Sequence, residues 1–92
     1  MVRFQLQFSP KAELDFASLE PKLRQRVVDK LGMFLNNEIH NENLEGNFQN
    51  FYKLRVGDYR IIYELIETSV MRVRLIGHRS RVYKDLKRLL DS

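Results

Sequence analysis

A hairpin signal in the second half of the chain constrains the fold most. Residues 51–56 and 59–67 are rich in β-branched and aromatic side chains, and only Gly57 and Asp58 separate them. Such a pair between two strand-like runs is typical of a two-residue hairpin loop. A loop of this length fixes which residues face each other, so Val56 pairs with Tyr59 and Arg55 with Arg60. The sequence therefore predicts an antiparallel hairpin in a single register.

This register sorts the hairpin side chains onto two faces of a sheet. One face is apolar enough to lie against helices and carries Tyr52, Leu54, Val56, Tyr59, Ile61 and Tyr63. Its three tyrosines are therefore expected in the core. The other face gathers Lys53, Arg55 and Arg60, and like charges directly opposite each other destabilise a sheet. Either an anionic partner relieves this repulsion or a nearby carboxylate such as Glu64 does so.

The first half of the chain predicts one strand and two helices. Residues 2–8 alternate, with Phe4, Leu6 and Phe8 on one side, as in a half-buried strand. Ser9 and Pro10 are typical of a helix cap and first helical position, and this helix is expected to end near residue 18. Pro21 begins a second helix. The apolar stripes of the two helices comprise Ala12, Phe16 and Leu19, and then Leu23, Val27, Leu31, Phe34 and Leu35. Residues 36–50 show no clear period and are expected to form a loop.

After the hairpin, the pattern predicts a third strand at 70–77 and a last helix at about 80–91. The apolar stripe of that helix comprises Val82, Leu86, Leu89 and Leu90. A two-residue turn at 68–69 would leave Arg72 and Arg74 facing the helices, whereas a longer loop or a bulge would turn them away. Residues 1–92 thus predict a single α+β domain. It comprises an N-terminal strand, a helical hairpin, a three-stranded antiparallel meander completing a sheet, and a C-terminal helix.

Charge and composition narrow the classes of function. The chain has 92 residues, 43% of them hydrophobic, which is enough apolar surface for one independently folding domain. Its net charge of +4 arises after residue 52, where there are 10 basic residues and 5 acidic ones. This excess favours an acidic or nucleic-acid partner, although a basic surface can also serve solubility alone.

Other classes are disfavoured. The chain has no cysteine, so it has no disulfide scaffold and no thiolate site, and its two histidines lack metal-ligand spacing. We therefore expect no metal or other cofactor. Apolar runs are too short for a membrane span and no secretory segment is visible, so we expect a cytoplasmic protein without membrane contact.

Several motifs together resemble the RelE/ParE superfamily of bacterial and archaeal toxins. They are YKLRVGDYRIIYE at 52–64, IGHR at 76–79 and VY at 82–83, with FSPKA at 8–12 and LEG at 44–46. Each motif alone is weak, but their order spans nearly the whole chain. GHR followed by VY is more similar to RelE than to ParE.

The resemblance implies a microbial-ribonuclease-like fold and the toxin of a type II toxin–antitoxin system. It implies an endoribonuclease that binds the ribosome and cleaves mRNA during translation, held inactive by a cognate antitoxin in a hetero-oligomeric complex. The family's catalytic residues carry over as Lys53, Arg55, Arg60, Arg79 and Tyr83. Lysine is common in the family where this chain has Arg55. A proton-transfer role is doubtful there, because guanidinium hardly ever gives up a proton.

Such a site suits cleavage without a metal, by attack of a 2′-hydroxyl on the adjacent phosphate. His78 is either a further acid or base or a hydrogen-bonding residue at the end of its strand. Four further basic residues are expected on the polar side of the last helix, against ribosomal RNA or the antitoxin: Arg81, Lys84, Lys87 and Arg88. The alternatives are a ParE-like inhibitor that binds DNA gyrase and a catalytically inactive relative.

Overall fold

The α+β class and the order of elements expected from the sequence are confirmed. The computed structural model describes residues 5–36, 42–43, 50–67 and 69–91. Its elements are β1 (Gln5–Phe8), α1 (Pro10–Ala17), α2 (Pro21–Leu35), β2 (Glu42–Asn43), β3 (Tyr52–Val56), β4 (Tyr59–Ile66), β5 (Val70–His78) and α3 (Val82–Leu90). Phe4, His40 and the LEG motif at 44–46 lie outside the described residues.

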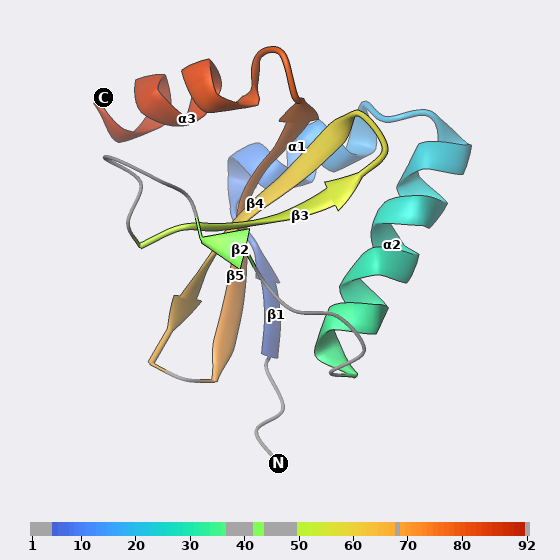
Figure 1. Cartoon of the computed structure of the whole chain (residues 1–92), viewed down its shortest axis with the longest axis horizontal. Helices are drawn as coiled ribbons and strands as arrows, with labels where there is room; N and C mark the ends of the chain where they lie inside the picture. Colours follow the sequence, from blue (N-terminus) through green and yellow to red (C-terminus); the bar gives the residue numbers. More distant parts are fainter. Residues whose placement is uncertain (1–4, 37–41, 44–49, 68, 92) are drawn as a thin grey trace.

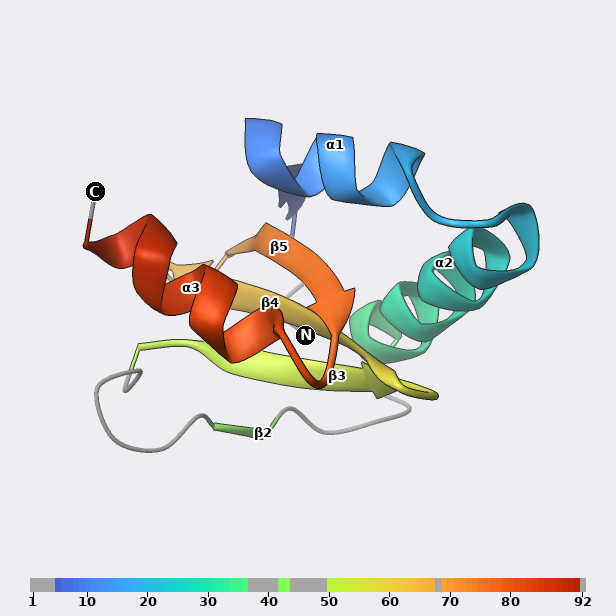
Figure 2. The same ribbon diagram turned by 90° about the horizontal axis from the view of Figure 1, so that it is seen from above.

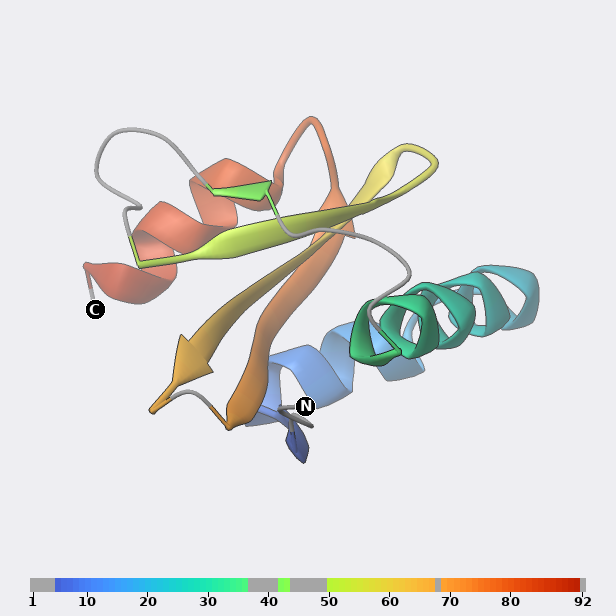
Figure 3. The same ribbon diagram turned by 60° about the horizontal axis from the view of Figure 1, so that its bottom comes forward.

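The strands form one mixed sheet in the order β1-β5-β4-β3-β2 (Figure 1). The predicted hairpin register is confirmed, since Val56 lies opposite Tyr59 and Arg55 opposite Arg60. β1 runs parallel to β5 and antiparallel pairs make up the rest. The expectation of a loop throughout 36–50 is wrong at β2, which lies beside β3 (Figure 3). Two residues are too few to leave a strand pattern in the sequence.

The connection between β4 and β5 decides on which face the two arginines of β5 lie, and a bulge follows that connection. Ile66 pairs with Val70, so the connection spans three residues and Glu64 pairs with Arg72. Ile62 pairs with Leu75 but the next residue, Tyr63, pairs with Val73, so Arg74 is an extra residue in β5. Val73 therefore faces the helices with Tyr63, whereas Arg74 lies on the opposite face. Of the alternatives that the sequence left open, the longer loop and the bulge are both present, and the loop is what turns Arg72 and Arg74 away from the helices.

Side chains of the α1 region replace the strand partner that β5 loses where β1 ends. Ser9 caps α1 as predicted, because its Oγ accepts from the Ala12 N–H at 3.2 Å. The same hydroxyl donates to the carbonyl of Arg74 at 2.9 Å, and the carboxylate of Asp15 accepts from the Ile76 N–H at 3.0 Å. These bonds satisfy backbone groups at an otherwise unpaired strand edge.

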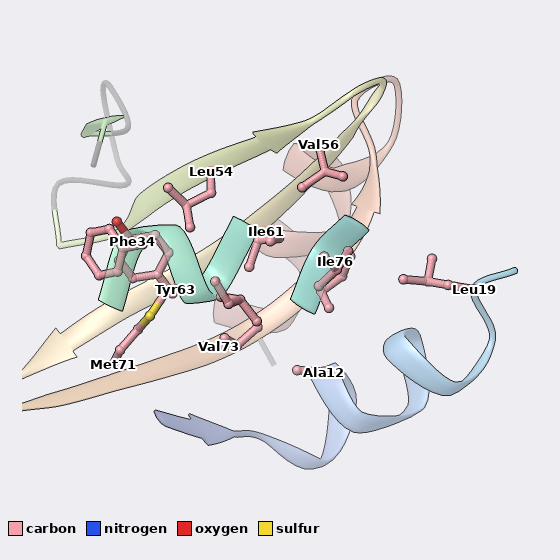
Figure 4. Close-up of a cluster of buried hydrophobic side chains, with 12 residues drawn as sticks. Ala12, Leu19, Phe34, Leu54, Val56, Ile61, Tyr63, Met71, Val73 and Ile76 are labelled. Carbon is pink, nitrogen blue, oxygen red and sulfur yellow. The ribbon is translucent and has the colours of Figure 1, made fainter. Parts of the chain in front are cut away.

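The main core lies between the sheet and the pair α1 and α2, and Figure 4 shows its side chains pointing into that layer. The predicted stripes of both helices face it, with Ala12, Val27 and Leu31 buried. The predicted core tyrosines are also confirmed: Tyr63 is fully buried, and Tyr52 and Tyr59 pack against the cluster. Leu6 is an exception at 38% exposure, because β1 is an edge strand with little cover.

The hydroxyl of Tyr63 is buried in this core. Tyr52 stacks on the Tyr63 ring at 5.6 Å between centroids, and Phe34 of α2 lies 5.4 Å away. Within the described residues the hydroxyl has no hydrogen-bond partner. Burial, with a smaller contribution from neighbouring Tyr52, raises the pKa of Tyr63 well above its ordinary value. The group is therefore neutral across the physiological range.

A second, smaller core lies on the opposite face, under α3, and in Figure 2 the strands lie between α3 and α2. Its buried members are Phe51, Ile62, Leu75, Val82 and Leu86. α3 begins at Val82 and not at residue 80, because a short turn follows β5. Leu90, predicted on the apolar stripe, is 41% exposed beyond the edge of this cluster. None of the described helices is both long and apolar enough to span a bilayer.

Candidate active site

The β3–β4 hairpin brings three basic residues to the face that α3 partly covers. Arg55 and Arg60 are direct cross-strand partners, and Lys53 lies opposite Ile62 of the second core. Because the hairpin loop has two residues, this arrangement follows from the local sequence alone. The basic face expected from the sequence is thus present in the structure, at the end of the sheet nearest the turn.

The turn itself joins two of the predicted site residues. Gly57 has φ of 58°, a left-handed conformation that glycine adopts without strain. Nη1 of Arg60 donates to the carbonyls of Gly57 at 3.0 Å and Tyr59 at 2.9 Å. The Arg79 N–H donates to the carbonyl of Asp58 at 2.7 Å, and Nε of Arg79 lies 3.6 Å from Oδ1 of Asp58. Arg60 and Arg79 therefore both bind residues of the turn, although 18 residues separate them along the chain.

The first turn of α3 supplies an aromatic ring beside the basic face. Nζ of Lys53 lies 5.9 Å from the centre of the Tyr83 ring, within the range of a cation–π interaction. Tyr83 is half-buried because it packs on the second core. The structure thus places Lys53, Arg55 and Arg60 on one face, with Tyr83 beside Lys53 and Arg79 at the adjoining hairpin turn.

The carboxylate expected as a possible neutraliser is bound elsewhere. Oε1 of Glu64 accepts from Nη1 of Arg74 at 2.9 Å, and the Arg74 guanidinium also lies 5.9 Å from the Phe51 ring. At the turn, Asp58 is the acidic side chain beside Arg79, and both are largely exposed. Water screens an exposed pair of this kind, so Asp58 offsets little of the positive charge.

His78 lies on the other side of the sheet. Its cross-strand partner is Tyr59, and their rings meet edge to face at 5.5 Å. It lines a pocket of about 550 Å³ with the carboxylates of Asp15, Glu20 and Asp85, against α1 and not against the basic face. The structure therefore separates the His78 ring from the basic residues of β3 and β4 and from Tyr83.

The four basic residues expected for RNA or antitoxin contact are all exposed around α3: Arg81, Lys84, Lys87 and Arg88. Lys84, Lys87 and Arg88 line a surface hollow of about 460 Å³. The sequence did not identify Lys11, Arg72 and Arg74 as site residues, yet they line a neighbouring hollow of about 350 Å³ beside Leu89. Only the β4–β5 register places these arginines there, and no local pattern reveals that register.

The arrangement is suited to binding and stabilising negative charge. Guanidinium groups bind phosphate oxygens through paired donors and remain charged at any physiological pH. Among the described residues, no cluster of three or more histidine, aspartate or glutamate side chains is placed to hold a metal ion. The chemistry available from the described side chains is cationic stabilisation, with Lys53 and Tyr83 as candidates for proton transfer.

Comparisons with known proteins identify the family and the fold. A model of the family described as the ParE toxin of type II toxin–antitoxin systems, parDE, matches residues 6–83. Among solved structures, a variant of the E. coli toxin RelE in the free state is 26% identical, with a TM-score of 0.73 over 96% of this chain and 98% of that one.

Two toxin–antitoxin complexes are also similar in fold. The RelBE2 complex from Mycobacterium tuberculosis has 21% identity and a TM-score of 0.73 over 85% of this chain and all of that one. The DinJ–YafQ complex from E. coli has 13% identity and a TM-score of 0.71 over 89% and 99%. No sequence among curated proteins matches the chain significantly.

Proposed function

The chain belongs to the ParE toxin family of type II toxin–antitoxin systems, within the RelE/ParE superfamily, and we propose that this toxin is a ribosome-dependent mRNA endoribonuclease. The observation that carries the proposal is the cross-strand pair of Arg55 and Arg60. Two arginines directly opposite each other across a sheet offer several donors to one anion, and a phosphate lying across the strands would bind both.

The proposed reaction is a transesterification within the RNA. The 2′-oxygen bonds to the adjacent phosphorus and loses its proton, while the bond from phosphorus to the 5′-oxygen breaks and that oxygen gains a proton. Arg55 and Arg60 stabilise the extra charge on the phosphorane, and Arg79 binds the phosphate or the leaving group. Lys53 stabilises charge or transfers a proton, and Tyr83 stacks on or orients a nucleotide.

Dependence on the ribosome follows from the weakness of this set as acids and bases. Guanidinium stays protonated at neutral pH and cannot act as an acid or base, so three of the five groups contribute charge alone. Orientation of the 2′-hydroxyl in line with the leaving group then has to come from elsewhere, and a ribosome-bound mRNA is already held in place. A ribosomal substrate also assigns the protein to the cytoplasm.

The proposed inhibitor is a cognate antitoxin. The similar RelBE2 and DinJ–YafQ structures are complexes with antitoxins, and this chain presents a basic surface around α3 that suits an acidic segment. An antitoxin that covers Arg79 and the first turn of α3 would block the site directly. The complex is expected to be hetero-oligomeric.

The test is to add purified protein to a reconstituted translation reaction and map new 5′ ends on the mRNA, with and without ribosomes. We expect new ends within codons only when ribosomes are present. Lys53→Ala and Arg79→Ala should each abolish these ends in folded protein, whereas Lys22→Ala, which removes one exposed charge from α2, should not. Equal cleavage of naked RNA would contradict ribosome dependence.

A second candidate is inhibition of DNA gyrase, which the match to a ParE family model favours. A gyrase supercoiling assay separates the two candidates. Inhibition of supercoiling without any new mRNA ends would replace the nuclease proposal. Harmless overexpression with neither activity would instead indicate an inactive relative.

A further inference from the structure

His78 makes contacts that point to a role other than direct catalysis. The Ser80 N–H donates to Nδ1 of His78 at 3.1 Å, and Oγ of Ser80 lies 2.8 Å from the same nitrogen. An N–H group can only donate, so Nδ1 must be an acceptor and carry no proton. The neutral ring then carries its proton on Nε2.

The same histidine is bound through its main chain. Its carbonyl accepts from the Arg81 N–H at 3.0 Å, and its ring packs edge to face against Tyr59. His78 thus contacts the hydroxyl and the N–H of Ser80 and the N–H of Arg81. Arg79 lies between His78 and Ser80 in the chain, and its N–H donates to the carbonyl of Asp58 in the hairpin turn. The segment between β5 and α3 is therefore held by His78 at one side and by the hairpin at the other.

We propose that His78 is a positioning residue whose unprotonated Nδ1 holds the turn that presents Arg79 and begins α3. Its ring touches neither the basic face nor Tyr83, because it lies on the α1 side of the sheet. It acts by fixing the Ser80 amide, and thereby the direction in which Arg79 leaves the sheet and α3 starts. This positioning role deepens the proposed nuclease function, and the activity measurement that tests the role rests on that function.

Four substitutions of His78 separate this role from direct catalysis and from packing. Asn places its Oδ1 near the position of Nδ1, whereas Gln places its amide near the position of Nε2. Phe keeps an aromatic ring without an acceptor. Ala removes the ring and both nitrogens. We expect His78→Asn to cleave mRNA close to the wild-type rate. His78→Gln, His78→Phe and His78→Ala should lose about tenfold to a hundredfold through misplacement of Arg79.

Other patterns of activity would overturn the proposal. Equal loss in all four variants would mean that the imidazole itself acts in the reaction. Rescue by Gln and not by Asn would assign the role to Nε2. Rescue by Phe would mean that the ring only packs on Tyr59.

A measurement without substrate keeps this inference separate from the proposed function. The chain has two histidines, so His40→Gln leaves His78 as the only imidazole in a ¹⁵N NMR spectrum. At a pH where the ring is neutral, we expect an unprotonated Nδ1 and a protonated Nε2. We also expect the Ser80 amide to exchange with solvent faster in His78→Gln than in His78→Asn. The opposite tautomer, or equal exchange in both variants, would overturn the proposal even if the protein cleaves mRNA.

Discussion

The face of the sheet under α1 and α2 and the face under α3 use the same strands for different purposes. Under α1 and α2, buried apolar side chains run from Val56 near the turn to Met71 near the far end of β5. Under α3 the apolar cluster covers only part of the sheet, and basic residues take the rest. The main core and the candidate chemistry therefore lie on opposite faces, so substitutions in the main core should lower stability without altering the site, and substitutions of the basic residues should do the reverse.

The largest expected effect is on activity, from the basic face. Arg60→Ala removes a guanidinium from the candidate phosphate site, so the rate of ribosome-dependent cleavage should fall by about a hundredfold. The free energy of unfolding in urea should change by less than about 1 kcal/mol, because the Arg60 bonds to the turn are part-exposed or exposed. A stability loss large enough to account for the lost activity would break the comparison between the faces.

Ile61 and Ile62 provide a matched pair across the sheet. They are adjacent in β4, both are fully buried, and they point into the main core and the α3 core respectively. Each change to Ala should cost about 2–5 kcal/mol, measured by urea unfolding, with Ile62→Ala at the lower end because α3 can settle into the space.

The same pair sharpens the comparison through activity. Ile62→Ala should also reduce cleavage in the fraction that remains folded, because Tyr83 packs on the second core. Ile61→Ala should not. Equal residual activity in the two folded variants would mean that α3 does not need this core to hold its position.

A smaller effect is expected at the hairpin turn that joins the two halves of the site. Gly57→Ala forces an L side chain into φ of 58° and places its Cβ 3.1 Å from Nη2 of Arg26, so it should cost about 1–2 kcal/mol. Gly32→Ala in α2 is the control, because its Cβ would meet nothing within 4 Å. That change should raise the free energy of unfolding by about 0.5–1 kcal/mol. Similar results for both would mean that the turn conformation is not required.

The smallest effect near neutral pH is expected from Tyr63→Phe. Removing a buried hydroxyl without a partner among the described residues should leave stability unchanged or slightly higher. Because the pKa of Tyr63 is raised in the folded state, the wild type should lose stability as pH rises above about 10, where the unfolded tyrosine ionises. The pH dependence of urea unfolding should be less steep in the variant above that pH. Parallel curves would mean that Tyr63 does not ionise on unfolding.

What the sequence could predict depended on distance along the chain. The pairing of Arg55 with Arg60 was predictable because a two-residue loop fixes it locally. The sides on which Arg74 and His78 lie were not predictable, because they depend on the three-residue connection between β4 and β5 and on the bulge that follows it. The cover over Leu6 was not predictable either, since alternation predicts a strand but not that the strand is an edge.

The pairing of β1 with β5 has a consequence for the order of events during synthesis. Gln5 lies opposite Val70 and Phe8 opposite Val73, so the first strand made has to wait for the last one. Closing a loop of that length is slow compared with local folding, and a chain emerges from the ribosome amino terminus first. The nascent protein therefore cannot complete its sheet, or hold Arg79 against the hairpin turn, until β5 and the turn after it have left the ribosome. With this topology, the residues of the proposed site come together only once β5 can pair with both β1 and β4.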